Sequence, residues 1–353
     1  MTMAKTLRST ALVLLGAALC LPPTAPGQSV GGPAMGFVLD EAAGLRPILG
    51  MPGAATLGRP ARSLAGFGNV VFSLQRDYAL ALVQADGRVV LVQDLSRLPR
   101  GNLLDLPPGA ARLAASPTGD AAAFYYGDSR TVKVLIGLPG SPVVSWTAEL
   151  PELVGGLAAL AVSDGGRGVL AAGAEPGPVL MAAPDIETRT LWAVGGSPSV
   201  AFLVNSLDAV VADGALHRVV VVRDPKGDAQ VLQIADASQG VSGPVAVTTA
   251  SDGRQVFVAN ADPPGVLALS LAGEDTITLP CACRPTGLDR LAGDGVFRLN
   301  DARQGPLWLL DDTGASPRIV FVPYEQSQPS SRVLPVRVRE TGGESAPRVR
   351  ATR

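Results

Sequence analysis

The sequence predicts an all-β fold, a β-propeller of about seven four-stranded blades, and three observations support this prediction. Turn-forming segments recur at a period in the forties along the 353-residue chain. Short runs of β-branched and small residues lie on both sides of each turn, and no helical periodicity follows the N-terminal segment. A unit of about 40–45 residues that contains four strands is typical of a propeller blade.

The repeat is marked by turns of similar composition. The serines at 116, 163, 206 and 251 are separated by 47, 43 and 45 residues, and similar turns extend the series toward both ends of the chain. In chain order, the segments are Gln75-Arg-Asp77, Ser116-Pro-Thr-Gly119, Ser163-Asp-Gly-Gly166, Asn205-Ser-Leu-Asp208, Ser251-Asp-Gly253 and Ala292-Gly-Asp294. Six full units therefore fit between about Val70 and Val322.

Each unit is expected to contain four short strands. In the second unit they are predicted at 111–115, 121–126, 131–136 and 143–147. In the fifth unit they are predicted at 245–249, 255–260, 266–271 and 276–279. Gly, Pro, Asp or Asn lie between these runs, as strand ends require. Because one twisted sheet of four strands cannot bury both of its faces, we expect each sheet to stack against its neighbours in a ring.

The two ends of the chain decide the number of blades. Two further strands are predicted at 36–41 and 45–50, and a last candidate lies at 333–338. We expect these strands to complete a seventh blade, with six blades plus an N-terminal hairpin as the alternative. The predicted organisation is a signal peptide at 1–27, a linker at 28–35, the propeller at 36–324 and a C-terminal tail at 325–353. The tail is rich in Ser, Pro, Gly and Arg, so most of it is expected to be disordered.

The N-terminal residues predict export. Lys5 and Arg8 precede the apolar run 11–20, and small or helix-breaking residues follow as far as Gly27. An apolar core of about 7–15 residues with small residues after it is typical of a secretory signal peptide. We expect cleavage near Gly27 and a periplasmic or extracellular protein, with an uncleaved membrane anchor as the alternative.

Composition limits the partners that the protein can bind. The formal net charge is −2 and only 17% of the residues are charged, which argues against nucleic acid as a partner. After the signal peptide no segment reaches the about 18 consecutive apolar residues of a membrane helix, so no integral membrane segment is expected in the mature chain. We expect a monomer that binds an unidentified protein or small ligand.

The cysteines predict a disulfide and no metal site. If Cys20 leaves with the signal peptide, Cys281 and Cys283 remain, and an oxidising compartment favours a disulfide between them, with a pair of unreactive thiols as the alternative. Two thiolates and the distant His217 make a poor zinc site, so neither a metal nor a cofactor is predicted. The alternative is Ca²⁺ in the channel with Asn260 and Asn300 as oxygen ligands, although such sites usually contain several carboxylates.

The fifth unit supports a more specific comparison. Gly240-Val-Ser-Gly-Pro244 is followed by Val-Ala-Val-Thr-Thr and then by Ser251-Asp-Gly-Arg-Gln-Val-Phe-Val-Ala-Asn260. This unit resembles the repeat of the YVTN and surface-layer propeller family, with Val256-Phe-Val-Ala-Asn260 at the position of the name motif. The segment 160–170 matches the repeat more loosely. The resemblance implies a ring of blades and an exported protein, and it implies no particular chemistry.

Candidate binding residues follow from propeller topology. The connections between blades and the turns between second and third strands share one face, which carries polar residues around the mouth of the channel. These residues are Asp128, His217, Asn260, Arg284 and Asn300. Arg284 is the cation among them that can hold an anion in bidentate fashion. The alternative is that the Asn and Asp residues are there only as turn formers.

No catalytic residues are predicted. His217 is the only histidine of the chain, so a Ser–His–Asp mechanism has little support. Trp146, Trp192 and Trp308 fall in third-strand or outer-strand runs, where we expect them to pack between blades. The leading hypothesis is an exported propeller that acts as a non-catalytic binding or scaffold module. The alternatives are a metal-dependent hydrolase of the lactonase type and a structural component of the cell envelope.

The export hypothesis predicts a defined N-terminus. When the chain is expressed with its own leader in a bacterial host, intact-mass measurement of the exported protein should show that it begins near Gln28. Leu14→Arg interrupts the apolar run and should leave the full-length chain in the cytoplasm. An envelope-associated protein that keeps residues 1–27 would instead support the anchor.

Overall fold

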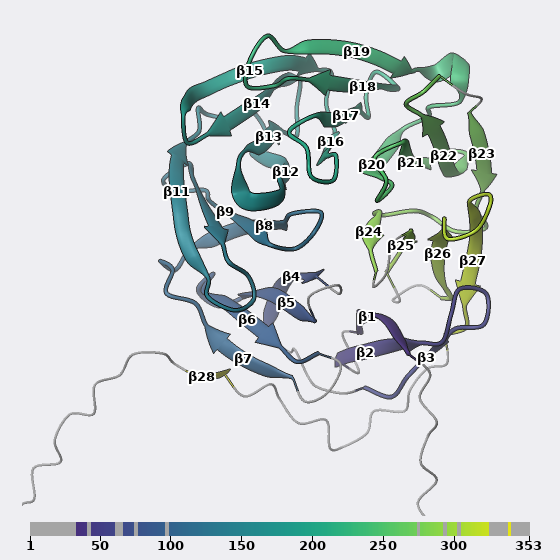
Figure 1. The fold of residues 1–353 in the computed structure, drawn as a ribbon, viewed down its shortest axis with the longest axis horizontal. Helices are drawn as coiled ribbons and strands as arrows, with labels where there is room; N and C mark the ends of the chain where they lie inside the picture. Colours follow the sequence, from purple (N-terminus) through teal and green to yellow (C-terminus); the bar gives the residue numbers. More distant parts are fainter. Residues whose placement is uncertain are drawn as a thin grey trace, which may run out of the picture. The chain divides into compact units, whose positions relative to one another are not determined.

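Seven small sheets make up the fold, and all the described strands except β28 pair with strands that are adjacent to them in sequence (Figure 1). The computed structural model describes residues 33–40, 44–60, 66–73, 77–95, 99–273, 276–291, 295–301, 305–324 and 338–339. Within the unit Gly31–Arg353, the sheets stand around a central axis in chain order. The predicted all-β propeller of seven blades is confirmed.

The first three blades after the N-terminal sheet are antiparallel and contain four consecutive strands each. Blade 1 consists of β4 (Phe67–Ser73), β5 (Tyr78–Val83), β6 (Val89–Gln93) and β7 (Arg100–Leu103). Blade 2 consists of β8 (Ala110–Ala115), β9 (Ala121–Tyr126), β10 (Thr131–Ile136) and β11 (Val143–Glu149). Blade 3 consists of β12 (Leu157–Val162), β13 (Val169–Gly173), β14 (Gly177–Ala183) and β15 (Ile186–Val194).

The next three blades repeat this pattern. Blade 4 consists of β16 (Pro198–Phe202), β17 (Ala209–Asp213), β18 (Arg218–Arg223) and β19 (Gln230–Ala235). Blade 5 consists of β20 (Pro244–Thr249), β21 (Gln255–Ala261), β22 (Pro264–Ser270) and β23 (Ile277–Pro280). Blade 6 consists of β24 (Asp289–Arg290), β25 (Val296–Arg298), β26 (Leu307–Asp311) and β27 (Arg318–Val322). The strands predicted for the second and fifth units agree with blades 2 and 5 to within two residues.

Blade 7 is built from the N-terminal strands. It contains β1 (Ala34–Asp40), β2 (Gly44–Leu49) and β3 (Thr56–Leu57). The sequence instead predicted that a strand at 333–338 completes this blade. In the structure β28 (Val338–Arg339) pairs in parallel with β7, on the outer edge of blade 1, and residues 333–337 lie outside the described residues. The predicted signal peptide and most of the predicted tail also lie outside them.

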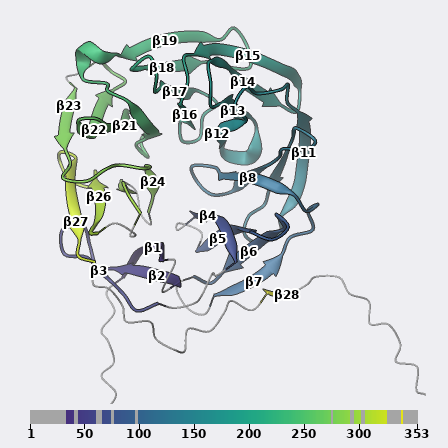
Figure 2. The same ribbon diagram turned by 180° about the vertical axis from the view of Figure 1, so that it is seen from behind.

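Apolar side chains between successive blades hold the ring together. Seven buried clusters of the described residues occupy the seven junctions, and the first strand of each blade lies nearest the axis in both views (Figures 1 and 2). At the junction of blades 6 and 7, Val38 and Ile48 pack with Leu309, and at the junction of blades 7 and 1, Phe37 packs with Val90. Fully burying one such side chain contributes about 1.5–3 kcal/mol, so this packing contributes substantially to closing the ring. Arg46 of blade 7 also lies over the ring of Tyr324, which follows blade 6, at 5.6 Å from its centroid.

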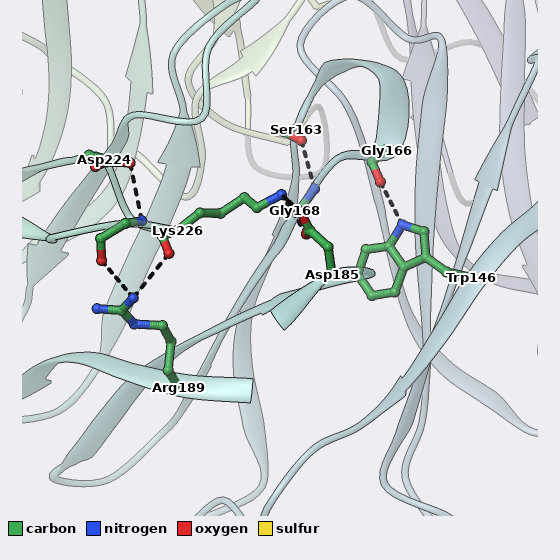
Figure 3. A network of polar contacts seen from close by, with 9 residues as sticks. Trp146, Ser163, Gly166, Gly168, Asp185, Arg189, Asp224 and Lys226 are labelled. Carbon is green, nitrogen blue, oxygen red and sulfur yellow. Dashed lines mark hydrogen bonds and ion pairs between the residues drawn. The ribbon is translucent and has the colours of Figure 1, made fainter. Parts of the chain in front are cut away.

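The three tryptophans pack at blade junctions, as predicted. Trp146, Trp192 and Trp308 lie against the clusters between blades 2 and 3, 3 and 4, and 5 and 6. The indole Nε1 of Trp146 also donates a hydrogen bond of 2.6 Å to the carbonyl of Gly166 in the next blade (Figure 3). These rings therefore cover the partly exposed outer ends of the apolar clusters.

Polar contacts join the blades on the face that carries the turns between first and second strands. Asp164 is 5% exposed and starts the short 3-10 helix η2 (Asp164–Gly166). Its Oδ1 accepts hydrogen bonds from the backbone amide and the hydroxyl of Thr118 in blade 2, both 2.8 Å. Its Oδ2 accepts one from the amide of Asn205 in blade 4, at 2.6 Å. One carboxylate thus connects three consecutive blades.

The outer strands and their turns add an ion pair and hydrogen bonds between blades 3 and 4 on the same face. The Lys226 ammonium pairs with Asp185 at 2.5 Å, which connects the third-to-fourth-strand turns of blades 4 and 3 (Figure 3). Arg189 of β15 donates to the carbonyls of Lys226 and Gly227, at 3.2 and 2.7 Å. Exposed ion pairs contribute little individually, so these contacts position the turns more than they stabilise the ring.

A pair of identical Ser-Asp-Gly turns tests the role of Asp164. Asp164→Ala removes the acceptor of three inter-blade hydrogen bonds and should lower the free energy of unfolding by about 2–4 kcal/mol. Asp252 occupies the same position in blade 5 but is exposed and accepts a hydrogen bond from the Arg254 amide within its own turn. Asp252→Ala should therefore change the urea unfolding midpoint only slightly. Equal shifts for the two variants would contradict the inter-blade role.

Candidate functional site

The face opposite these turns carries the connections between blades and the turns between second and third strands, and it is called the loop face below. All five predicted binding residues belong to it. Asp128 is exposed in the turn between β9 and β10, and Arg284 is exposed in the connection between blades 5 and 6. Asn300 follows β25, where its side chain accepts from the Trp308 amide at 2.7 Å and donates to the Pro306 carbonyl at 3.2 Å.

His217 and Asn260 come together around one connection, the segment 240–243 between blades 4 and 5. Asn260 is 4% exposed, accepts from the Ser242 amide at 3.1 Å and donates to the Gly240 carbonyl at 2.8 Å. The Nδ1 atom of His217 accepts from the Gly243 amide at 2.8 Å. Both side chains hold the backbone of this connection, which agrees with the alternative that such residues stabilise turns. Their role in binding a ligand stays a prediction.

Hydrogen bonds link the loop-face segments of blades 3, 4 and 5 into a chain, with backbone groups joining blades 3 and 4 and the His217 side chain joining blades 4 and 5. The amide of Ser197 in blade 4 donates to the carbonyl of Ala174 in blade 3 at 2.9 Å. The amide of Gly214 donates to the carbonyl of Ser197 at 3.3 Å, and that of Ala261 donates to Gly243 at 3.1 Å. We call this chain the loop belt; it comprises residues 153–156, 174–176, 195–197, 214–217, 240–245 and 261–263.

A buried carboxylate supports the middle of the loop belt. Asp213 is fully buried and accepts hydrogen bonds from the amides of Gly195, at 2.8 Å, and Leu216, at 3.1 Å. Arg218 is 3.5 Å from the same carboxylate and lies over the Trp192 ring, 4.4 Å from its centroid. A Cβ atom at Gly195 would lie 2.6 Å from the Leu216 side chain, so a larger residue here would require that side chain to shift.

The loop belt exposes large apolar side chains. Val154 is 57% exposed, Leu216 is 52% exposed and Val245, at the start of β20, is 41% exposed. Val154 lies in the segment that accepts hydrogen bonds from the amides of Ala174, at 3.1 Å, and Glu175, at 3.5 Å. Leu216 and Val245 lie next to the hydrogen-bonded groups described above. None of these three residues was predicted from the sequence. The sequence did contain an indication for Leu216. A four-residue turn does not require a large apolar residue, so such a residue there suggests a contact with another molecule or another part of the chain.

A cavity of about 280 Å³ lies in the central channel, between the ends of the innermost strands. Most of its lining residues are apolar, polar and apolar atoms contribute about equally to its surface, and its charged residues, Asp289, Arg290 and Arg298, all come from blade 6. None of the five predicted binding residues lines it. The sequence analysis missed these charged residues because blade 6 departs from the repeat: its innermost strand β24 contains only two residues.

The connection between blades 5 and 6 carries a disulfide. Cys281 and Cys283 are joined, with Cα atoms 5.0 Å apart, a separation that is usual for disulfides. Among the described residues no group of three or more His, Cys, Asp or Glu side chains is placed to hold a metal ion. The same residues include no helix with the length and apolar character of a membrane span.

Comparison with known proteins supports the fold and leaves the function open. Virginiamycin B lyase from Staphylococcus aureus is 15% identical, with a TM-score of 0.53 over 75% of this chain and 86% of that one. A "putative 6-phosphogluconolactonase" from Bacteroides uniformis is 13% identical, with a TM-score of 0.53 over 82% and 96%. A second protein of that description, from Bacteroides fragilis, is 10% identical, with a TM-score of 0.51 over 82% and 92%.

These likenesses define the chain as a β-propeller. No family model matches it, so the resemblance to the YVTN family stays a prediction. No curated protein matches it either. Identities of 9–15% establish a shared architecture, and the chemistry of these structures does not follow for this chain.

An acidic cluster at blades 5 and 6 predicts a pH dependence of stability. Burial, together with the carboxylates of Asp252 and Asp311, raises the pKa of Asp312 to about 6. When folding raises the pKa of a carboxyl, the unfolded chain loses that proton at a lower pH than the folded chain does. The free energy of unfolding therefore falls as the pH rises from about 4 through 6. Asp312→Asn should remove this loss, and its advantage over the wild-type chain in urea midpoint should grow between about pH 4 and pH 7.5.

Asp228→Asn, at an exposed aspartate in blade 4, is the matched control and should show no such trend. A constant difference between Asp312→Asn and the wild-type chain across this pH range would show that Asp312 has no raised pKa.

Proposed function

We propose that the protein is an exported, non-catalytic binding module that presents the loop belt to a protein partner in the cell envelope or outside the cell. One observation carries the proposal: Val154, Leu216 and Val245 are exposed on connections that are fixed to one another by hydrogen bonds. The signal-like N-terminus supports the compartment, and the partner's identity is left open.

The energetics of such a surface favour a protein ligand. Soluble monomers rarely expose contiguous apolar patches larger than a few hundred Å², and such patches commonly mark interaction sites. A rigid surface also binds more tightly than a mobile one, because little conformational entropy is lost on association. The chain of hydrogen bonds from Ala174 to Ser197 to Gly214 supplies this rigidity for blades 3 and 4, and the His217 contact extends it to blade 5.

The rival function is a metal-dependent propeller hydrolase of the lactonase type, with Ca²⁺ as the ion to test. The shared architecture with the two Bacteroides proteins favours it, together with the charged residues of blade 6 in the channel. A third candidate, a structural component of the envelope, would require self-association or firm attachment to the envelope.

Proximity labelling in the native envelope tests the proposal directly. The wild-type chain should label a reproducible set of proteins, and Leu216→Asp combined with Val154→Asp should lose that set, because charges at the centre of an apolar interface oppose burial. Leu232→Asp is the matched control, since Leu232 is 50% exposed on the outer strand β19, away from the loop belt.

Two results would overturn the proposal. The first is a labelled set that survives Leu216→Asp with Val154→Asp and disappears with Leu232→Asp. The second is hydrolysis of lactones by the purified chain that depends on added Ca²⁺ and is abolished by a chelator, which would establish the rival.

A further inference from the structure

The channel cavity combines mostly apolar lining residues with a single charged side. Every blade contributes to its lining, chiefly through the last residues of the innermost strands. The lining residues of blades 1 to 5 are mostly aliphatic or aromatic, with a few that carry hydroxyls; partly exposed examples are Val71, Leu160 and Thr248. At about 280 Å³ the cavity is just below the about 300–1,000 Å³ that is usual for ligand pockets.

The charged side exists because the innermost strand of blade 6 is short. β24 contains only Asp289 and Arg290, whereas the innermost strands of blades 1 to 5 contain five to seven residues. Of the residues that line the cavity, Arg298 is the one that belongs to a second strand. It pairs in register with Asp289, so its guanidinium reaches the channel beside β24.

Arg290 fixes this side of the channel to the neighbouring blade. It donates to the Ser251 hydroxyl and to the Thr249 carbonyl, both at 2.6 Å, and lies over the Phe297 ring at 4.9 Å. Its position is therefore set by blade 5 and by the core of blade 6. Arg290 therefore fixes β24 to blade 5. Arg298 is paired instead with carboxylates, which another anion could replace.

The partners of Arg298 are much more exposed than Arg298 itself. The Arg298 side chain is 15% exposed, whereas those of Asp289 and Asp301 are 61% and 50% exposed. Nη2 lies 2.5 Å from Asp289 Oδ2, and Nη1 lies 3.4 Å from Asp301 Oδ1. Burial acts to lower the pKa of Arg298, but both carboxylates raise it, and the net direction is upward. The guanidinium thus stays charged while it is mostly buried beside the cavity, so it requires an anionic partner.

We propose that the channel binds a small apolar carboxylate, whose carboxyl group replaces Asp289 on Arg298 and whose hydrocarbon part lies along the aliphatic walls. After the exchange the buried guanidinium is still paired, and the released Asp289 carboxylate, which is already more than half exposed, is solvated by water. No buried charge is therefore left without a partner. Arginine matches a carboxylate in bidentate geometry, and the apolar walls favour the burial of hydrocarbon. This site is separate from the loop belt and does not depend on the proposed protein partner.

Titration calorimetry of the mature chain with octanoate, and with octanol as the uncharged control, tests the proposal. The wild-type chain should bind octanoate at least about tenfold more tightly than octanol, as a charge-assisted hydrogen bond predicts. Arg298→Met should weaken octanoate by a similar factor and leave octanol unchanged. Arg223→Met, which removes an arginine paired with Asp208 outside the cavity, should leave both ligands unaffected.

Two more variants keep the test decisive if Arg298→Met does not fold. Asp289→Asn weakens the internal competitor at an exposed position and should tighten octanoate binding severalfold. Ala161→Leu fills part of the cavity and should weaken both ligands, because Ala161 lines the wall. No binding of octanoate by the wild-type chain, or binding that none of Arg298→Met, Asp289→Asn and Ala161→Leu changes, would overturn the inference.

Discussion

The structure depends on one constraint, the need of each small sheet to cover both of its apolar faces. A four-stranded blade has two such faces, and only its two neighbours can bury them. The seven clusters between the blades meet this need, and every other feature follows from the positions that they fix. The channel cavity is the space that remains between the innermost strands, and the loop belt runs over the ends of three consecutive blades.

The closure of the ring follows from the same need to bury apolar faces. Blade 7 consists of N-terminal strands, and its contacts with blades 6 and 1 are made by side chains such as Ile48 and Phe37. The C-terminal strand β28 does not share this blade and instead extends blade 1 at its outer edge. Apolar packing at the junctions of blade 7 with blades 6 and 1 therefore stabilises the closed ring. Polar contacts between blades add to it elsewhere, for example the hydrogen bond from the Tyr78 hydroxyl to the Gly119 carbonyl.

Much of the fold could be predicted because the repeat is local. Ser163-Asp-Gly and its relatives mark first-to-second-strand turns, so counting between them located whole blades. The pairing of β28 could not be predicted in this way, because strand addition at an edge depends on which edge is within reach in three dimensions. The candidate site was harder for the same reason. Asn260 and His217 were recognised as polar, but their hydrogen bonds to the 240–243 connection involve backbone groups that no side-chain pattern encodes. Arg298 reaches the channel only because β24 is short.

The central claim is that the loop belt is a rigid surface rather than a set of independent loops. Hydrogen exchange of the free mature protein, measured residue by residue, tests it most directly. The account predicts that the amides of Ser197, Gly214 and Gly243 exchange as slowly as those of the neighbouring innermost strands, since each donates a hydrogen bond within the belt. Exchange of these amides at the rate of an unprotected chain, with the strands still protected, would contradict the claim.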